Sequence, residues 1–171
     1  MRDVYTIGYE GCDIRDFLDT LEAVSIEVLV DVRELPLSRR KGFSKSKLAL
    51  ELRARGIEYL HLKPLGDPKA GREAARAGDW EAFKDVFSSR LSSPDAQIAL
   101  DELRTLARHR VVCMMCFEKS ASCCHRSALS NILTREGWKV FNLVGDRPRS
   151  YEDGSRKIPR HSLNQGISAA F

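Results

Sequence analysis

Short apolar segments alternate with amphipathic segments along almost the whole chain, and this alternation limits the available folds more than any other feature. In the amphipathic segments apolar residues recur every three or four positions, which is typical of helices packed on a core. Strands are predicted at residues 4–7, 26–32, 57–62, 110–116 and 138–144. Helices are predicted at 14–24, 46–55, 80–91, 94–106 and 124–136. Strands that alternate with helices form right-handed crossovers and a parallel sheet covered on both faces.

We therefore predict an α/β fold: a single-domain, three-layer α/β/α sandwich with a mostly parallel five-stranded sheet, Rossmann-like, with the strand order 3-2-1-4-5. The domain should cover residues 1–146, with 147–171 as a C-terminal tail that packs on it or is partly flexible. Residues 63–78 should form a long connection with a helical turn at 72–77. Ligands of open α/β sheets bind at the carboxyl ends of the strands, next to a switch point, here between strands 1 and 4.

The composition excludes several classes of protein. No run approaches the roughly 18 apolar residues of a membrane span. The start of the chain lacks the apolar core of a signal peptide, and an odd number of cysteines (five) argues against a disulfide framework. We expect a cytoplasmic protein without a membrane partner, with no cofactor predicted. A net charge of +4 is compatible with an anionic small molecule and gives only weak support to nucleic acid.

Residues 113–126 contain four of the five cysteines and most of the chemically reactive side chains. Strand 110–116 ends in Cys116 and is followed by Glu118, while the next helix opens with Cys124, His125 and Arg126. In the first hypothesis Cys116 is a nucleophile whose thiolate is favoured by His125, Arg126 and the positive end of the helix. Glu118 then serves as acid or base, or orients His125, and Cys124 is the alternative nucleophile.

A zinc site is the second hypothesis for this segment, because Cys113-x2-Cys116 and Cys123-Cys124-His125 resemble metal-ligand spacings. Two observations argue against it. Cys113 and Cys116 point to opposite faces of a regular strand, and adjacent residues are awkward ligands for one tetrahedral centre. We therefore predict no metal ligands. A third hypothesis, that the cysteines are small buried apolar residues, suits Cys113.

Two other strand ends carry polar residues that should meet the cysteine segment at one edge of the sheet. Arg33, held by Asp31, either reads an anion or forms a local ion pair, and the basic loop that follows contains Arg39. His61 and residues 146–147 could frame the edge. The turn after the first strand could hold an anion through its backbone, or be a plain connection; it consists of Gly8, Tyr9, Glu10 and Gly11.

These motifs, in this order and over residues 5 to about 146, resemble the DUF488 family, whose name marks a domain of unknown function. The resemblance rests on Thr6-Ile7-Gly8-Tyr9-Glu10-Gly11, Asp31-Val32-Arg33, Pro36, Ser38, Arg39, Phe43, Gly56-Ile57, Tyr59, Leu65-Gly66, Cys116-Phe117-Glu118 and Cys124-His125-Arg126. It implies a compact α/β sandwich and a bacterial or archaeal cytoplasmic protein, but no reaction. Phe117 replaces an expected alanine and Cys123 is an extra thiol.

The leading hypothesis is a small enzyme that acts on an anionic small molecule such as a nucleotide or nucleic-acid component. Catalysis is assigned to Cys116, Glu118, Cys124 and His125, and ligand binding to Gly8, Tyr9, Glu10, Gly11, Asp31, Arg33, Arg39 and Arg126. The alternatives are a non-catalytic ligand- or nucleic-acid-binding module and a zinc or redox protein. The oligomeric state does not follow from the sequence.

Overall fold

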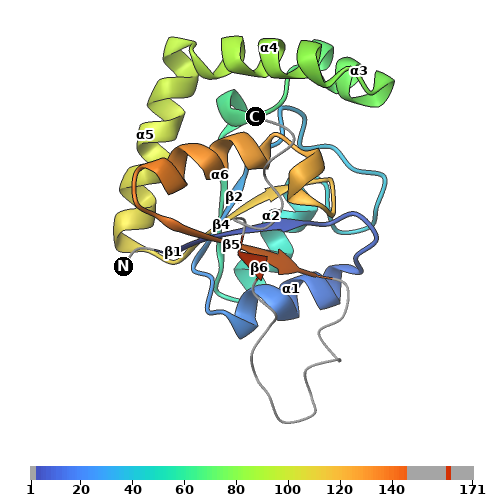
Figure 1. Cartoon of the computed structure of the whole chain (residues 1–171). Helices are drawn as coiled ribbons and strands as arrows, with labels where there is room; N and C mark the ends of the chain where they lie inside the picture. Colours follow the sequence, from blue (N-terminus) through green and yellow to red (C-terminus); the bar gives the residue numbers. More distant parts are fainter. Residues whose placement is uncertain (1–2, 146–160, 163–171) are drawn as a thin grey trace.

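The structure is a computed structural model that describes residues 3–145 and 161–162, and its centre is a single six-stranded sheet (Figure 1). The strands are β1 (Asp3–Gly8), β2 (Val28–Asp31), β3 (Glu58–His61), β4 (Val112–Cys116), β5 (Lys139–Val144) and β6 (His161–Ser162). The helices are α1 (Ile14–Ala23), α2 (Lys45–Ala54), α3 (Lys69–Ala77), α4 (Trp80–Leu91), α5 (Pro94–His109) and α6 (Arg126–Arg135). Two short 3-10 helices complete the described chain: η1 (Lys63–Leu65) and η2 (Ala121–Cys123).

The predicted α/β sandwich is confirmed, but the predicted strand order is wrong. The sheet runs β3-β2-β4-β1-β5-β6, so β4 lies between β2 and β1 and pairs in parallel with both. Every residue of β4 is buried, and such a strand is most stable where both of its edges and both of its faces are covered. The short antiparallel strand β6 was not predicted, and the rest of the predicted tail and residues 146–147 lie outside the described residues.

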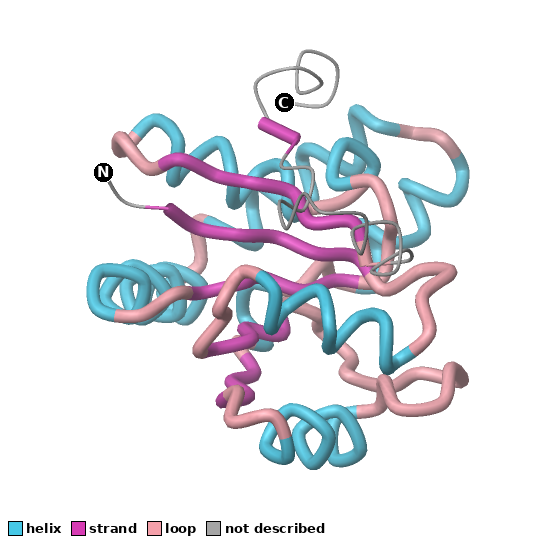
Figure 2. The backbone as a smooth tube through the Cα atoms, turned by 90° about the horizontal axis from the view of Figure 1, so that it is seen from below, coloured by secondary structure: helices cyan, strands magenta, loops and turns pink. Residues whose placement is uncertain are grey.

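Helices cover the sheet on both faces, and each face has its own apolar core. On one face Val30 and Met114 pack with Leu103 of α5 and Leu129 of α6. On the other face Ile7, Phe17 of α1 and Leu52 of α2 form the second cluster, together with Cys113. Figure 1 shows α6 above the strands and α1 below them, while Figure 2 shows the strands side by side from below. Cys113 and Cys116 thus lie on opposite faces, as predicted.

The connection predicted at 63–78 contains a full nine-residue helix, α3, and not a single helical turn. The only apolar side chains of this helix are those of alanines, so no large apolar residue marks it as a core-facing helix. Pro68 precedes the helix, and Gly78 ends it in the left-handed conformation (φ 74°). α3 packs on α4 and stands outside the sandwich, so the pattern of the core gave no signal for it (Figure 1).

Backbone hydrogen bonds fasten the ends of β1 and β4 together where the site forms. Tyr9 N–H donates to the carbonyl of Cys116 (3.3 Å) and Glu10 N–H donates to the carbonyl of Phe117 (2.8 Å). The turn after β1 and the loop after β4 therefore form one rim at the carboxyl edge of the sheet. Within the described part of the chain, no helix is long and apolar enough to span a membrane.

Candidate functional site

Two thiols and an imidazole meet at the carboxyl end of β4. His125 Nδ1 lies 3.7 Å from Cys116 Sγ and 3.7 Å from Cys124 Sγ, and the three atoms all lie within 4.8 Å of one another. The other ring nitrogen, Nε2, lies 2.9 Å from the carbonyl oxygen of Val32. A carbonyl only accepts hydrogen bonds, so Nε2 carries a proton and Nδ1 faces the sulfur atoms. The structure thus brings the side chains of Cys116, Cys124 and His125 together.

Glu118 completes this cluster. The Cys116 thiol donates a hydrogen bond to Glu118 Oε2 over 3.0 Å. Burial raises the pKa of the Glu118 carboxyl to about 7, helped by the negative charge of Cys124. The carboxyl therefore titrates near neutral pH and is in reach of the Cys116 proton.

The two thiols are not equivalent, because the surrounding charges favour the thiolate of Cys124. Burial by itself raises the pKa of Cys124, but the hydrogen bond from Cys116 and the charges of His125 and Arg126 outweigh it and lower the pKa well below its usual value. For Cys116, burial and the neighbouring Cys124 both raise the pKa. Burial lowers the pKa of His125, but the Cys124 charge reverses this and raises it to about 9. The metal-free cluster thus favours a Cys124 thiolate beside a His125 imidazolium.

Arg126 lies beneath the cluster and not in contact with solvent, with 1% of its surface exposed. Its Nη1 donates to Thr6 Oγ1 (3.2 Å) and its Nη2 donates to the carbonyl oxygen of Glu118. Nε has no hydrogen-bond partner, and no carboxylate pairs with this guanidinium among the described residues. The sequence assigned Arg126 to the ligand, but the structure places it where it holds the loop and faces the thiols.

Close packing requires a glycine at position 8, which the sequence did not reveal. A Cβ at this position would lie 1.8 Å from the carbonyl oxygen of Glu118 and 2.9 Å from Arg126 Nη2. Glycine therefore lets the loop after β4 approach β1, and the backbone of Gly8 contacts the protein where the sequence placed a ligand. Gly11, with φ 79°, makes the turn. Glu10 accepts a hydrogen bond from Lys119 N–H (3.0 Å) and ties the same two loops together.

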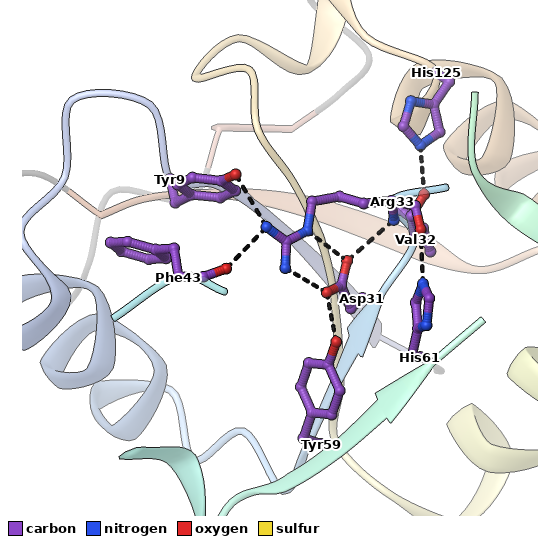
Figure 3. Close-up of polar contacts among 8 residues, drawn as sticks. All are labelled: Tyr9, Asp31, Val32, Arg33, Phe43, Tyr59, His61 and His125. Atoms are coloured by element: carbon purple, nitrogen blue, oxygen red, sulfur yellow. Dashed lines mark hydrogen bonds and ion pairs between the residues drawn. The ribbon is translucent and has the colours of Figure 1, made fainter. Parts of the chain in front are cut away.

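Arg33 is held on all sides by protein groups (Figure 3). Its Nε and Nη2 donate to the two oxygens of Asp31 over 2.8 and 2.6 Å, and its Nη1 donates to Tyr9 Oη and to the carbonyl of Phe43, both at 3.0 Å. Tyr59 Oη donates to Asp31 Oδ2 (2.6 Å). Burial lowers the pKa of Arg33, but the Asp31 carboxylate outweighs it and raises the pKa above its usual value. Of the two sequence hypotheses, this geometry matches the local ion pair.

The loop after β2 also anchors two histidines (Figure 3). His125 donates to the carbonyl of Val32, and His61 Nε2 donates to the carbonyl of Arg33 over 2.8 Å. The buried ion pair sets the course of this loop, so Asp31 and Arg33 orient the His125 ring indirectly.

A cavity of about 590 Å³ opens beside the cluster, and a second cavity of about 300 Å³ adjoins it. Cys116 lines the larger cavity and Cys124 the smaller one. Both cavities are lined by six shared residues: Asp67, Arg72, Arg76, Phe117, Glu118 and His125. The thiol cluster therefore lies at the boundary between two connected hollows.

Five arginines line the larger cavity, and three of them, Arg39, Arg40 and Arg76, have no acidic partner among the described residues. Arg72 pairs with Glu34 (2.5 Å), and Arg40 donates to the carbonyl of Cys12 (2.7 Å). Arg39 and Arg76 form no ion pair with any residue that the structure describes. The predicted ligand residue Arg39 thus lies on the cavity wall, and Arg76 is a cation that sequence reasoning missed because helix α3 was not predicted.

Asp67 is a second residue that sequence reasoning missed. It is 7% exposed, lines both cavities, and its Oδ1 has no hydrogen-bond partner. Burial raises the pKa of Asp67 to about 6, although the charges of His125 and Arg72 oppose this rise. Gly71 makes room for this carboxylate, because a Cβ there would lie 2.0 Å from Oδ1. In the sequence, Gly66, Asp67 and Pro68 signal only a turn.

Fold and site together define an α/β sandwich protein with a thiol–imidazole cluster at the carboxyl edge of its sheet, facing an arginine-lined cavity. The chain belongs to the family described as domain of unknown function DUF488, which matches residues 13–133. This match covers α1 through most of α6, including Asp31, Arg33 and the whole thiol cluster. Searches among curated proteins and among solved structures returned no match.

Proposed function

We propose that this chain is an enzyme that acts on an anionic small molecule of the nucleotide or nucleic-acid-component class, bound in the larger cavity. One observation carries the proposal: the cavity has unpartnered arginines on its wall, and the Cys116–Glu118–Cys124–His125 cluster lies at its boundary with the smaller cavity. A wall of free cations favours an anion, and a cluster of thiols with an imidazole favours nucleophilic chemistry. Free thiols persist in a reducing compartment, so we place the protein in the cytoplasm.

The recognition half of the proposal rests on Arg39, Arg76 and the ring of Phe117. Both guanidiniums can donate paired hydrogen bonds to a phosphate or carboxylate. Phe117 is 41% exposed on the cavity wall and packs edge-on against Tyr9, with ring centres 5.3 Å apart. An exposed ring beside free cations suits a ligand that has a flat apolar part and an anionic part, as a nucleotide does.

The chemical half of the proposal rests on the short contact between a thiol and a carboxylate. Glu118 Oε2 is 3.0 Å from Cys116 Sγ and can take the thiol proton as the sulfur attacks an electrophilic carbon of the ligand. The new carbon–sulfur bond replaces the bond to a leaving group, which departs with its electron pair. Cys124 is the alternative nucleophile, because it lies equally close to His125 Nδ1.

Ligand-induced thermal stabilisation tests the recognition half. Nucleoside monophosphates and inorganic phosphate should raise the melting temperature of the wild-type protein in buffer that contains EDTA. The Arg39→Gln/Arg76→Gln variant should lose this shift, whereas Arg108→Gln, an exposed arginine on α5 outside both cavities, should retain it. An equal shift in all three proteins would refute the arginine assignment.

Alkylation tests the chemical half. Iodoacetamide with peptide mass spectrometry should label Cys124 or Cys116, and a bound nucleotide should slow this labelling but not that of exposed Cys123. If the ligand binds but neither cluster thiol reacts, and Cys116→Ser/Cys124→Ser binds the ligand as wild type does, the protein is the non-catalytic binding module.

A further inference from the structure

We propose that Cys116, Cys124 and His125 bind one thiophilic divalent cation, Zn²⁺ in the first place, through Sγ, Sγ and Nδ1. This inference concerns the same side chains as the proposed function but does not depend on the nature of the anionic ligand. A sulfur that ligates a cation is not free to attack a carbon. The cation therefore regulates the site by holding both thiols in a non-nucleophilic form.

The distances between the donor atoms fit a tetrahedral centre. With bonds of about 2.3 Å to sulfur and about 2.0 Å to nitrogen, tetrahedral angles separate sulfur from nitrogen by about 3.5 Å and two sulfurs by about 3.8 Å. Nδ1 of His125 is 3.7 Å from each sulfur, and all three atoms lie within 4.8 Å of one another. The cluster thus needs little movement to accept an ion at its centre.

Adjacent residues Cys124 and His125 can serve one centre because the chain turns sharply between them. Cys124 ends η2 with an extended backbone (φ −146°, ψ 150°), whereas His125 has helical dihedrals (φ −57°, ψ −16°) as the N-cap of α6. This change of direction aims both side chains at the end of β4. The objection drawn from sequence adjacency therefore does not hold in space.

The surroundings of His125 are those of a metal-ligating histidine. Its Nε2–H donates to the carbonyl of Val32, which orients the ring, so Nδ1 presents its lone pair to the ion when metal binding displaces the Nδ1 proton. Phe87 packs on the ring with centres 5.3 Å apart and restricts its rotation. A backbone carbonyl as outer partner of a ligating imidazole is the common arrangement in metal sites.

A fourth ligand position is available on the cavity side. Glu118 Oε2 lies 3.0 Å from Cys116 Sγ, near the roughly 3.5 Å expected between an oxygen and a sulfur on one zinc ion. Cys124, Glu118 and His125 all line the smaller cavity, which offers the ion a path from solvent. Either this carboxylate or an oxygen of a cavity ligand can fill the position.

The donor set selects the kind of ion. Two sulfurs and one imidazole nitrogen suit Zn²⁺ and other thiophilic ions and exclude Mg²⁺ and Ca²⁺, which require oxygen ligands. One cation and two thiolates form a neutral unit, which suits the burial of Cys116 and Cys124, each 4% exposed.

Titration with Co²⁺, which reports thiolate ligation by absorption, tests the inference directly. Reduced, EDTA-treated wild-type protein should bind one Co²⁺ with a sulfur-to-cobalt charge-transfer band and tetrahedral d–d bands, and one equivalent of Zn²⁺ should remove both. Cys116→Ser and Cys124→Ser should each weaken Co²⁺ binding by more than about 100-fold. Replacement of a residue that only contacts a metal ligand costs up to about 100-fold in affinity, and the loss of a ligand itself should cost more. Cys123→Ser, the exposed neighbouring thiol, should bind as wild type does.

Each outcome decides the inference separately from the proposed function. Absence of the charge-transfer band in the wild-type protein overturns it whatever the variants do, and so does a band that survives both Cys116→Ser and Cys124→Ser. Nucleotide stabilisation is measured in EDTA, so its failure leaves the metal result untouched. Alkylation of Cys116 and Cys124 should stop when Zn²⁺ is added and resume with EDTA; labelling that ignores Zn²⁺ would refute the regulatory role.

Discussion

Replacement of Asp31 by alanine tests whether Arg33 is a structural cation or a ligand-binding one. Asp31 is fully buried and accepts hydrogen bonds from Arg33 N, Nε and Nη2 and from Tyr59 Oη. In Asp31→Ala the Arg33 charge remains buried and loses its only carboxylate partner within the described chain. Removal of one partner from a buried ion pair costs about 3–5 kcal/mol.

That cost translates into a large thermal shift. For a domain of this size 1 kcal/mol corresponds to about 2–4 °C, so Asp31→Ala should lower the melting temperature by roughly 6–20 °C. Tyr59→Phe removes a single hydrogen bond to the same carboxylate and should cost about 1.5 kcal/mol. The double variant Asp31→Ala/Arg33→Met leaves no buried charge and should be more stable than Asp31→Ala alone.

Urea denaturation of wild type, Asp31→Ala, Arg33→Met and the double variant provides the assay, with the interaction free energy taken from this double-mutant cycle. A loss below about 1 kcal/mol in Asp31→Ala, or single effects that simply add in the double variant, would refute the structural role of Arg33. Arg33 would then be a candidate for anion binding, as the sequence first suggested.

Two further substitutions test the packing and the charge beside the cluster. Gly8→Ala places a Cβ 1.8 Å from a backbone oxygen and should cost more than the roughly 1–3 kcal/mol typical of overpacking. The control Gly56→Ala, at φ 71° with open space around it, should cost only about 1 kcal/mol. Equal losses of unfolding free energy in urea denaturation would contradict the close-contact argument. The pKa of Asp67 is about 6 in the folded state, above its unfolded value near 3.8, so the folded state holds the proton more tightly. The unfolding free energy of the wild-type protein should therefore fall by up to about 3 kcal/mol as the pH rises from about 4 to 6.5. The raised pKa of Glu118 also lowers stability over this range, so Asp67→Asn should show a loss that is smaller by this amount, and parallel pH profiles of unfolding free energy for the two proteins would refute the raised pKa of Asp67.

Much of the fold followed from local pattern. The alternation of strands and helices predicted the sandwich, and the apolar positions of α1, such as Phe17 and Leu21, are those that the core buries. The position of β4 within the sheet did not follow from local pattern, because the order of the strands depends on which strand is covered on both faces and both edges. Helix α3 was missed because its only apolar side chains are those of alanines, so it lacks the large apolar residues by which the other helices were predicted.

For the site, the sequence determined which chemical groups lie near one another along the chain. Cys116, Glu118, Cys124 and His125 occur within ten residues, and a strand end followed by a helix start brings them to one edge of the sheet. That much depends on local structure, which is why it could be predicted.

Only the tertiary structure decided what those groups contact. It assigned Arg33 to Asp31 and Arg126 to the Glu118 loop, brought Asp67 and Arg76 from a distant segment to the cavities, and aimed His125 Nδ1 at both sulfurs through the carbonyl of Val32. The physical reason is that a buried charge or ring nitrogen takes its role from its partners. Those partners come from segments as far apart as residues 32 and 125, whose proximity no local pattern encodes.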